Sequence, residues 1–120
     1  MSRRYLTKTE AEFALRRGKT VEVFLGGFKV ENDKCIRWAT FTLSGSGVKG
    51  NLWEAFDQGS VEYCDIYTFD SPNGEYDEPV KTVISVDIEM AAKELGIIDQ
   101  KFVNQGMAES EYIAYIESST

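Results

Sequence analysis

Three runs of apolar, β-branched and aromatic residues occupy the middle of the chain, at residues 36–43, 48–56 and 61–69. No proline interrupts these runs, and their composition suits a pleated surface better than a helix. The segments between them, residues 44–47 and 57–60, contain glycine, serine and aspartate, which favour reversal of the chain. The pattern therefore predicts an antiparallel β-meander at the centre of the fold.

Two further strands are predicted on either side of this meander. In residues 19–30, Val21 and Val23 occupy alternate positions, and the pair Gly26-Gly27 indicates a bulge. Residues 80–86 are rich in β-branched side chains and are bounded by residues that favour turns. The sheet is therefore expected to contain about five strands, close to the usual number for a small domain.

Residues 7–18 have the features of a short N-terminal helix. Thr7 with Glu10, or Thr9 with Glu12, fits a capping box, in which a hydroxyl and a carboxylate each bind a free amide of the first turn. Acidic residues come first, basic residues follow and a glycine ends the segment, as the helix dipole and a left-handed C-cap favour.

A second helix is predicted at residues 87–96, where Asp87 caps the first turn and apolar residues recur at helical spacing before a glycine. Residues 111–117 fit either a last strand or a last helix, and their tyrosine and isoleucine content favours the strand. The predicted class is therefore α+β, an antiparallel meander with an N-terminal helix and a second helix packed on it.

The length of 120 residues, with 42% apolar and 28% charged residues, is typical of one soluble globular domain covering residues 1–120. The basic residues near the start are not followed by an apolar run, so neither a signal peptide nor a membrane span is predicted. We therefore expect a cytoplasmic protein without membrane attachment, either a monomer or a homodimer.

The sequence contains no histidine, which is the commonest general base and metal ligand. Cys35 and Cys64 are its two cysteines, so zinc sites with four Cys or His ligands are excluded. Free thiols are expected in an intracellular domain, and a disulfide across paired strands is the alternative. No catalytic residue, metal or cofactor is predicted, and we expect the protein not to be an enzyme.

Two motifs resemble ligand-binding loops without completing them. Residues 45–50 match G-x-G-x-x-G, but residues 57–60 end the following segment too early for the crossover helix of a dinucleotide fold. A hairpin turn is therefore favoured. Residues 70–79 contain four carboxylates, but their spacing departs from that of a calcium loop, so a solvated acidic loop is favoured over a metal site.

The net charge of −7 is divided unevenly along the chain. Residues 1–50 hold ten basic and five acidic residues, a net charge of +5, whereas residues 51–120 hold three basic and fifteen acidic residues, a net charge of −12. Such asymmetry indicates an electrostatic partner. The carboxylates predicted to bind this partner are Glu54, Asp57, Glu62, Asp65, Asp70, Glu75, Asp77 and Glu78. Glu54, Glu62 and Asp65 lie on predicted strands among apolar neighbours, so their side chains are expected to point to solvent.

Aromatic residues are densest in the same part of the chain, and Trp53, Tyr63 and Tyr67 are predicted to contact the partner. The alternative is that these rings belong to the core. A nucleic-acid platform would need a basic groove around them, so no direct binding of nucleic acid is predicted. Paired carboxylates such as Glu54 and Glu62 would act in catalysis only if one were buried with a raised pKa.

These features favour a non-catalytic binding protein whose carboxylates dock on a positively charged, nucleic-acid-handling protein and occupy a site meant for phosphates. By analogy of composition, we compare it with virus-encoded inhibitors of bacterial defence complexes, anti-CRISPR proteins included. One alternative is an immunity protein that neutralises a nuclease toxin. The other is a small-molecule-binding domain in which the sheet and helices enclose an aromatic pocket.

Overall fold

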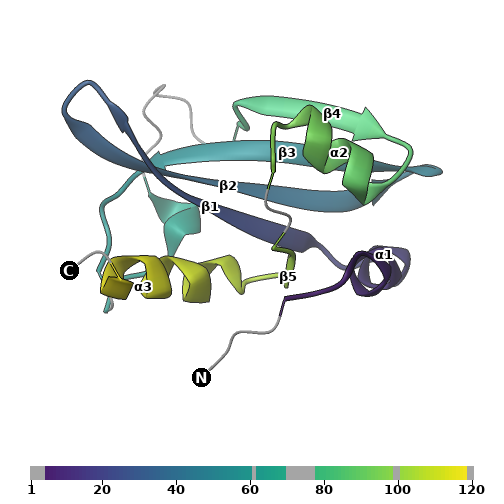
Figure 1. Ribbon diagram of the computed structural model, residues 1–120, viewed down its shortest axis with the longest axis horizontal. Helices are drawn as coiled ribbons and strands as arrows, with labels where there is room; N and C mark the ends of the chain where they lie inside the picture. Colours follow the sequence, from purple (N-terminus) through teal and green to yellow (C-terminus); the bar gives the residue numbers. More distant parts are fainter. Residues whose placement is uncertain (1–4, 61, 70–77, 99–100, 119–120) are drawn as a thin grey trace.

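The computed structural model describes residues 5–60, 62–69, 78–98 and 101–118. Its elements, in chain order, are α1 (Lys8–Arg16), β1 (Val21–Val30), β2 (Asp33–Ser44), β3 (Gly47–Phe56), the 3₁₀ turn η1 (Ile66–Thr68), β4 (Lys81–Ser85), α2 (Ile88–Glu94), β5 (Val103–Asn104) and α3 (Ala108–Ser118). The five strands form one sheet in the order β4-β3-β2-β1-β5, with every neighbouring pair antiparallel (Figure 1). The predicted α+β class, with an antiparallel sheet and an N-terminal helix, is confirmed.

The long strands β1, β2 and β3 form the centre of the sheet. The register between β1 and β2 shifts between Phe24 and Gly26, and Gly26 has a φ of 88°, so the predicted bulge is present. A tight turn at Gly45 and Ser46 joins β2 directly to the antiparallel strand β3. The G-x-G-x-x-G pattern is therefore a hairpin turn followed by a strand, as predicted.

The predicted strand at residues 61–69 is wrong, because the described residues of this segment form a loop that contains η1. The place beside β3 is taken by β4 instead. Ile66 and Phe69, three residues apart, are both buried, with exposed fractions of 0% and 6%. The apolar residues of this segment thus anchor a turn on the sheet, and they do not alternate along a strand.

The strand favoured at residues 111–117 is also wrong, since this segment lies within α3. Ala108 and Tyr112, four residues apart, are fully buried, which is the spacing of one helical face. The tyrosine and isoleucine content that favoured a strand reflects packing against the sheet, because tertiary contacts override intrinsic propensity.

Helices cover both faces of the sheet and create two cores. On one face, α1 and α2 pack over Val21, Val23 and Phe41. On the other face, α3 and the loop that contains η1 pack over Ile36 and Trp38 (Figure 1). Because neighbouring residues of a strand point to opposite faces, the alternating positions of β1 and β2 serve the two cores in turn.

The helices begin at the caps that the sequence predicts. Thr7 and Glu10 form the capping box of α1, with N–H···O distances of 3.0 and 3.1 Å. The Asp87 carboxylate accepts a hydrogen bond of 2.9 Å from the Met90 amide at the start of α2. No helix in the described ranges is both long enough and apolar enough to cross a lipid bilayer.

Candidate functional site

The loop formed by residues 57–60 and 62–69 and α3 together cover one face of the sheet, and we call them the acidic cover. Tyr112 of α3 joins its two parts, because the phenol oxygen accepts a hydrogen bond of 3.0 Å from the Gly59 amide and donates one to Asp57. The Tyr112 side chain is fully buried. Burial and the hydrogen bond to the Asp57 carboxylate raise the pKa of Tyr112, so the phenol is protonated at neutral pH.

Glu22 of β1 holds the acidic cover to the sheet. Its oxygen Oε1 accepts hydrogen bonds from the Tyr67 hydroxyl at 2.6 Å, the Gly106 amide at 3.1 Å and the Ala108 amide at 3.2 Å. Glu22 is only 3% exposed. The carboxylate therefore caps the start of α3, where free amides and the helix dipole favour negative charge. Burial and the bond to Glu22 raise the pKa of Tyr67.

Carboxylates are crowded in the acidic cover. Burial raises the pKa of Glu109, and a hydrogen bond to Asp65 and the negative charges of Asp65 and Glu22 raise it further. Residues 57–69 and 102–118 contain no lysine or arginine. No three or more Cys, Asp or Glu side chains in the described ranges are grouped so as to hold a metal ion. Burial and the neighbouring carboxylates thus both disfavour the charged form of Glu109.

The Asp65–Glu109 pair gives a pH-dependent prediction. The pKa of folded Glu109 lies above its ordinary value of 4.5, so the pair loses stability as the pH rises through 4.5 and through the folded-state pKa. Glu109→Gln removes this loss. We expect the variant to be more stable than the parent protein at pH 7 by roughly 0.5 kcal/mol, and equally stable at pH 3.5, in urea unfolding.

Glu62→Gln is the matched control, because Glu62 is an exposed carboxylate of the same loop. This variant should change stability by less than about 0.3 kcal/mol at both pH values. A Glu109→Gln protein that is less stable than the parent at pH 7 would contradict the inferred repulsion.

Glu54 is placed differently from the prediction. It does not point freely to solvent, because its side chain is only 17% exposed and Oε2 accepts hydrogen bonds of 2.9 and 2.6 Å from Arg37. The Arg37 guanidinium also lies 4.3 Å from the centre of the Phe28 ring. Cross-strand pairing of β2 with β3 places Arg37 opposite Glu54. Glu54 is therefore engaged within the sheet, and its suggested pairing with Glu62 on adjacent strands is wrong, since Glu62 lies in a loop.

The other predicted contact residues, apart from Trp53, fall into three groups. Those that the structure places in or beside the acidic cover are Asp57, Glu62, Asp65, Tyr63 and Tyr67. Glu78 is exposed just before β4. Asp70, Glu75 and Asp77, and with them most of the acidic loop, lie outside the described residues.

An aromatic hollow of about 420 Å³ opens beside the acidic cover. Its lining residues are Thr20, Glu22, Trp38, Thr40, Thr42, Trp53, Tyr67, Gln105 and Gly106. Trp38 and Trp53 are cross-strand partners with ring centres 6.5 Å apart, and the Tyr67 ring meets Trp38 edge-on at 6.0 Å. The Trp53 indole N–H donates a hydrogen bond of 2.9 Å to the Thr40 hydroxyl. Trp53 therefore lines an open hollow on this face of the sheet.

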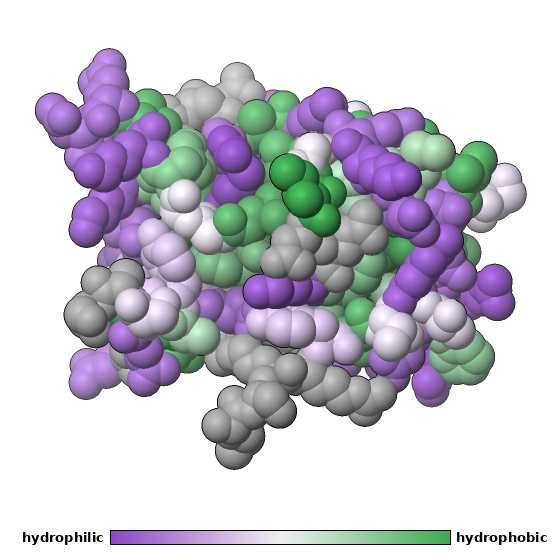
Figure 2. All heavy atoms as spheres, in the orientation of Figure 1, coloured by the Kyte–Doolittle hydropathy of each residue, from purple (hydrophilic) through white to green (hydrophobic). Residues whose placement is uncertain are grey.

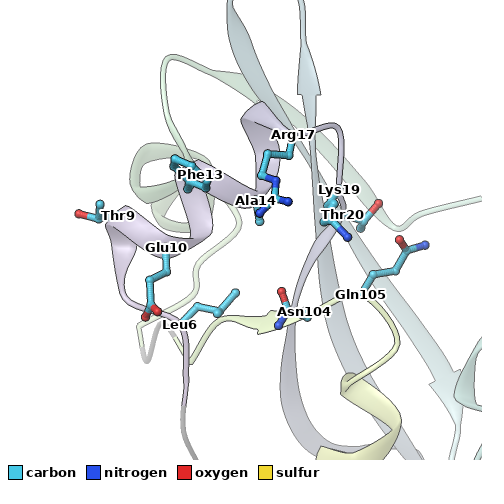
Figure 3. A pocket seen from close by; sticks show the side chains of 10 residues that line it. All are labelled: Leu6, Thr9, Glu10, Phe13, Ala14, Arg17, Lys19, Thr20, Asn104 and Gln105. Carbon is cyan, nitrogen blue, oxygen red and sulfur yellow. The ribbon is translucent and has the colours of Figure 1, made fainter.

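A second hollow, of about 750 Å³, lies between α1 and the edge of the sheet (Figure 3). Phe13 of α1 and Arg17 at its C-cap line it on one side and Lys19 on another, and the Arg17 guanidinium lies 5.7 Å from the Phe13 ring centre. Glu10, at its rim, serves the capping box of α1. None of the predicted contact residues that the structure describes lines this hollow.

Three residues of the site were missed from the sequence: Glu22, Glu109 and Tyr112. Glu22 could have been found from the sequence, because it alternates with Val21 and Val23 and so points to the same face as Phe24. That face carries the core under α3. Tyr112 carries no usable signal because the composition of residues 111–117 favours a strand, and Glu109 lies just outside that predicted strand. The thiols of Cys35 and Cys64 are free, as predicted.

The charge pattern elsewhere is mixed. At the turn between β1 and β2, exposed Lys29 and Lys34 accompany exposed Glu31 and Asp33. Figure 2 shows hydrophilic side chains gathered at this end of the molecule, with hydrophobic ones nearer the middle of the same face. The acidic cover differs because it carries charge of one sign only.

The acidic cover, Glu22 and the aromatic hollow adjoin one another on one face of the sheet. They share Tyr67, which belongs to the cover and lines the hollow. Their chemistry is that of carboxylates, hydroxyls and aromatic rings. Comparison of the chain with protein-family models, with curated proteins and with solved structures finds no match.

Proposed function

We propose that this protein is a non-catalytic binding protein whose acidic cover docks on a positively charged surface of another protein. The observation that supports this most strongly is the crowding of Asp65 and Glu109 in a cover that has no lysine or arginine. Repulsion between these carboxylates costs free energy in the isolated protein. A cationic partner would relieve it, and the relieved repulsion would add to the affinity.

Two aromatic side chains of the acidic cover are suited to anchor such a partner. Tyr63 is 52% exposed and Tyr67 is 41% exposed, although the Tyr67 hydroxyl is held by buried Glu22. Tyrosine offers a large apolar area at a low entropic cost and is enriched at the centres of interfaces. Asp57, Glu62 and Asp65 belong to the same loop as these two rings, so the loop offers aromatic anchors together with carboxylates.

The partner that we propose is a cytoplasmic nucleic-acid-handling protein, because such proteins present clustered lysine and arginine side chains to phosphates. An acidic cover would occupy that surface and exclude the nucleic acid. Virus-encoded inhibitors of bacterial defence complexes, such as anti-CRISPR proteins, act on this kind of target, and an immunity protein for a nuclease toxin would use the same electrostatics.

Charge reversal in the acidic cover tests the proposal. The double variant Glu62→Lys/Asp65→Lys is compared with the parent protein in affinity capture from a bacterial lysate, at about 0.05 M and 0.5 M salt, with mass spectrometry of the captured proteins. We expect the parent to retain a nucleic-acid-handling protein at low salt only. The double variant should lose at least about 90% of it, since attraction becomes repulsion.

The matched control is Glu31→Lys/Asp33→Lys, which makes the same change of net charge at the turn between β1 and β2. This control should capture the partner as well as the parent protein does. Equal loss in both variants would show that only net charge matters, and capture that is insensitive to salt would remove the acidic cover from the interaction.

A further inference from the structure

Glu22 places a buried negative charge in the wall of the aromatic hollow. The hollow is lined by Glu22, Trp38, Trp53 and Tyr67, together with three threonines, and its lining includes no lysine or arginine from the part of the chain that the structure describes. Glu22 is 3% exposed, so water screens its charge poorly. A charge in this position acts on any group that enters the hollow.

The Glu22 carboxylate has capacity left for a ligand. The three hydrogen bonds that it accepts, from the Tyr67 hydroxyl and the amides of Gly106 and Ala108, all go to Oε1. None of these three donors binds Oε2, and a carboxylate offers about four acceptor positions over its two oxygens. The donors fix the orientation of the carboxylate, so a bound cation would meet an oriented group.

The aromatic rings add a second attraction for positive charge. Trp38 and Trp53 lie side by side with an angle of 14° between their planes, and Tyr67 closes one side at 88° to Trp38. Electron-rich rings attract cations, tryptophan most strongly. A volume of about 420 Å³ is within the range of small-ligand sites.

We propose that the aromatic hollow binds an organic cation, a guanidinium or alkylammonium group, with Glu22 as its counter-ion and Trp38, Trp53 and Tyr67 around it. The cation belongs either to a free small molecule or to an arginine or lysine side chain of the protein that docks on the acidic cover. Only the second possibility, a side chain of a docked protein, rests on the proposed function. In that case the hollow is the socket for one side chain of the partner.

Intrinsic fluorescence tests the proposal directly, because Trp38 and Trp53 are the only tryptophans of the chain and both line the hollow. The purified protein is titrated with Nα-acetyl-arginine amide, Nα-acetyl-lysine amide and, as the neutral counterpart of the first, Nα-acetyl-citrulline amide. We expect a saturable change with a Kd on the order of 1 mM for at least one cation. The citrulline derivative should bind at least about tenfold more weakly, since it lacks the charge.

Glu22→Gln separates charge from shape, since the amide oxygen still accepts the three hydrogen bonds. Cation binding should weaken about tenfold or more in this variant and stay within about twofold in Glu62→Gln. Trp53→Leu leaves Glu22 and its donors in place, and it should weaken binding about threefold or more, with Trp38 as the reporter. Equal binding of citrulline and arginine derivatives, or unchanged binding in Glu22→Gln, would overturn the proposal.

The two proposals fail separately. If the purified protein binds the cations but captures no partner, the hollow is a site for a free organic cation and the proposed docking function is contradicted. The opposite result is that Glu22→Gln captures the partner as tightly as the parent protein does, and that the purified protein does not bind the arginine or lysine derivative. This result would support docking through the acidic cover and would overturn the proposed cation site in the hollow.

Discussion

Replacing Tyr112 by alanine is expected to lower the free energy of unfolding by about 4 kcal/mol. Tyr112 is fully buried and packs against Phe24 and Phe69, with ring centres 6.1 and 5.6 Å away. Its removal leaves a cavity between the sheet and the acidic cover. It also leaves the Gly59 amide without the acceptor that the phenol oxygen provides. Urea unfolding followed by circular dichroism measures the loss.

Tyr112→Phe separates the contribution of the ring to the free energy of unfolding from that of the hydroxyl group. Phenylalanine keeps the ring, so the variant should lose only the hydrogen bonds of the phenol oxygen with Gly59 and Asp57, about 1–2 kcal/mol. Ile84→Ala is the control, since Ile84 is 65% exposed on the edge strand β4 and should cost less than about 0.5 kcal/mol. A Tyr112→Ala protein within about 1 kcal/mol of the parent would mean that α3 does not depend on this packing.

The sequence predicts the parts of this fold that are held by local patterns. The capping box of α1, the turn at Gly45 and the bulge at Gly26 depend on residues close to one another in the chain, and each is found where the pattern places it. The strands β1, β2 and β3 are long enough for alternation to be read clearly. Their polar and apolar positions decide which side chains face each core.

The segments predicted wrongly cover the sheet and are not part of it. In residues 62–69 and in α3, aromatic and β-branched residues suggested strands, but Ile66 and Tyr112 are buried because they pack on the second core. The packing partners lie about 30–75 residues away in the chain, as with Trp38 in the same core. Short apolar runs do not distinguish a strand from a buried helix by period alone.

The site is predicted only in part, because contacts between residues distant in the chain decide it as well. The sequence shows the excess of carboxylates in the second half of the chain. It does not show which of these carboxylates pair with a lysine or arginine. Arg37 pairs with Glu54 across two strands, whereas Asp65 meets Glu109 through contacts between a loop and a helix. Only the fold shows which carboxylate finds a cation and which finds another carboxylate.

Replacing Glu22 by leucine is expected to lower the free energy of unfolding by about 3 kcal/mol, because it leaves the Tyr67 hydroxyl and the amides of Gly106 and Ala108 without their acceptor. Glu22→Gln keeps an acceptor oxygen and should lose about 1 kcal/mol. Urea unfolding of Glu22→Leu, Tyr67→Phe and the double variant measures their coupling, expected near about 1 kcal/mol. Additive losses would show that Tyr67 and Glu22 act independently, and Glu22 would then hold the acidic cover only through the amides at the start of α3.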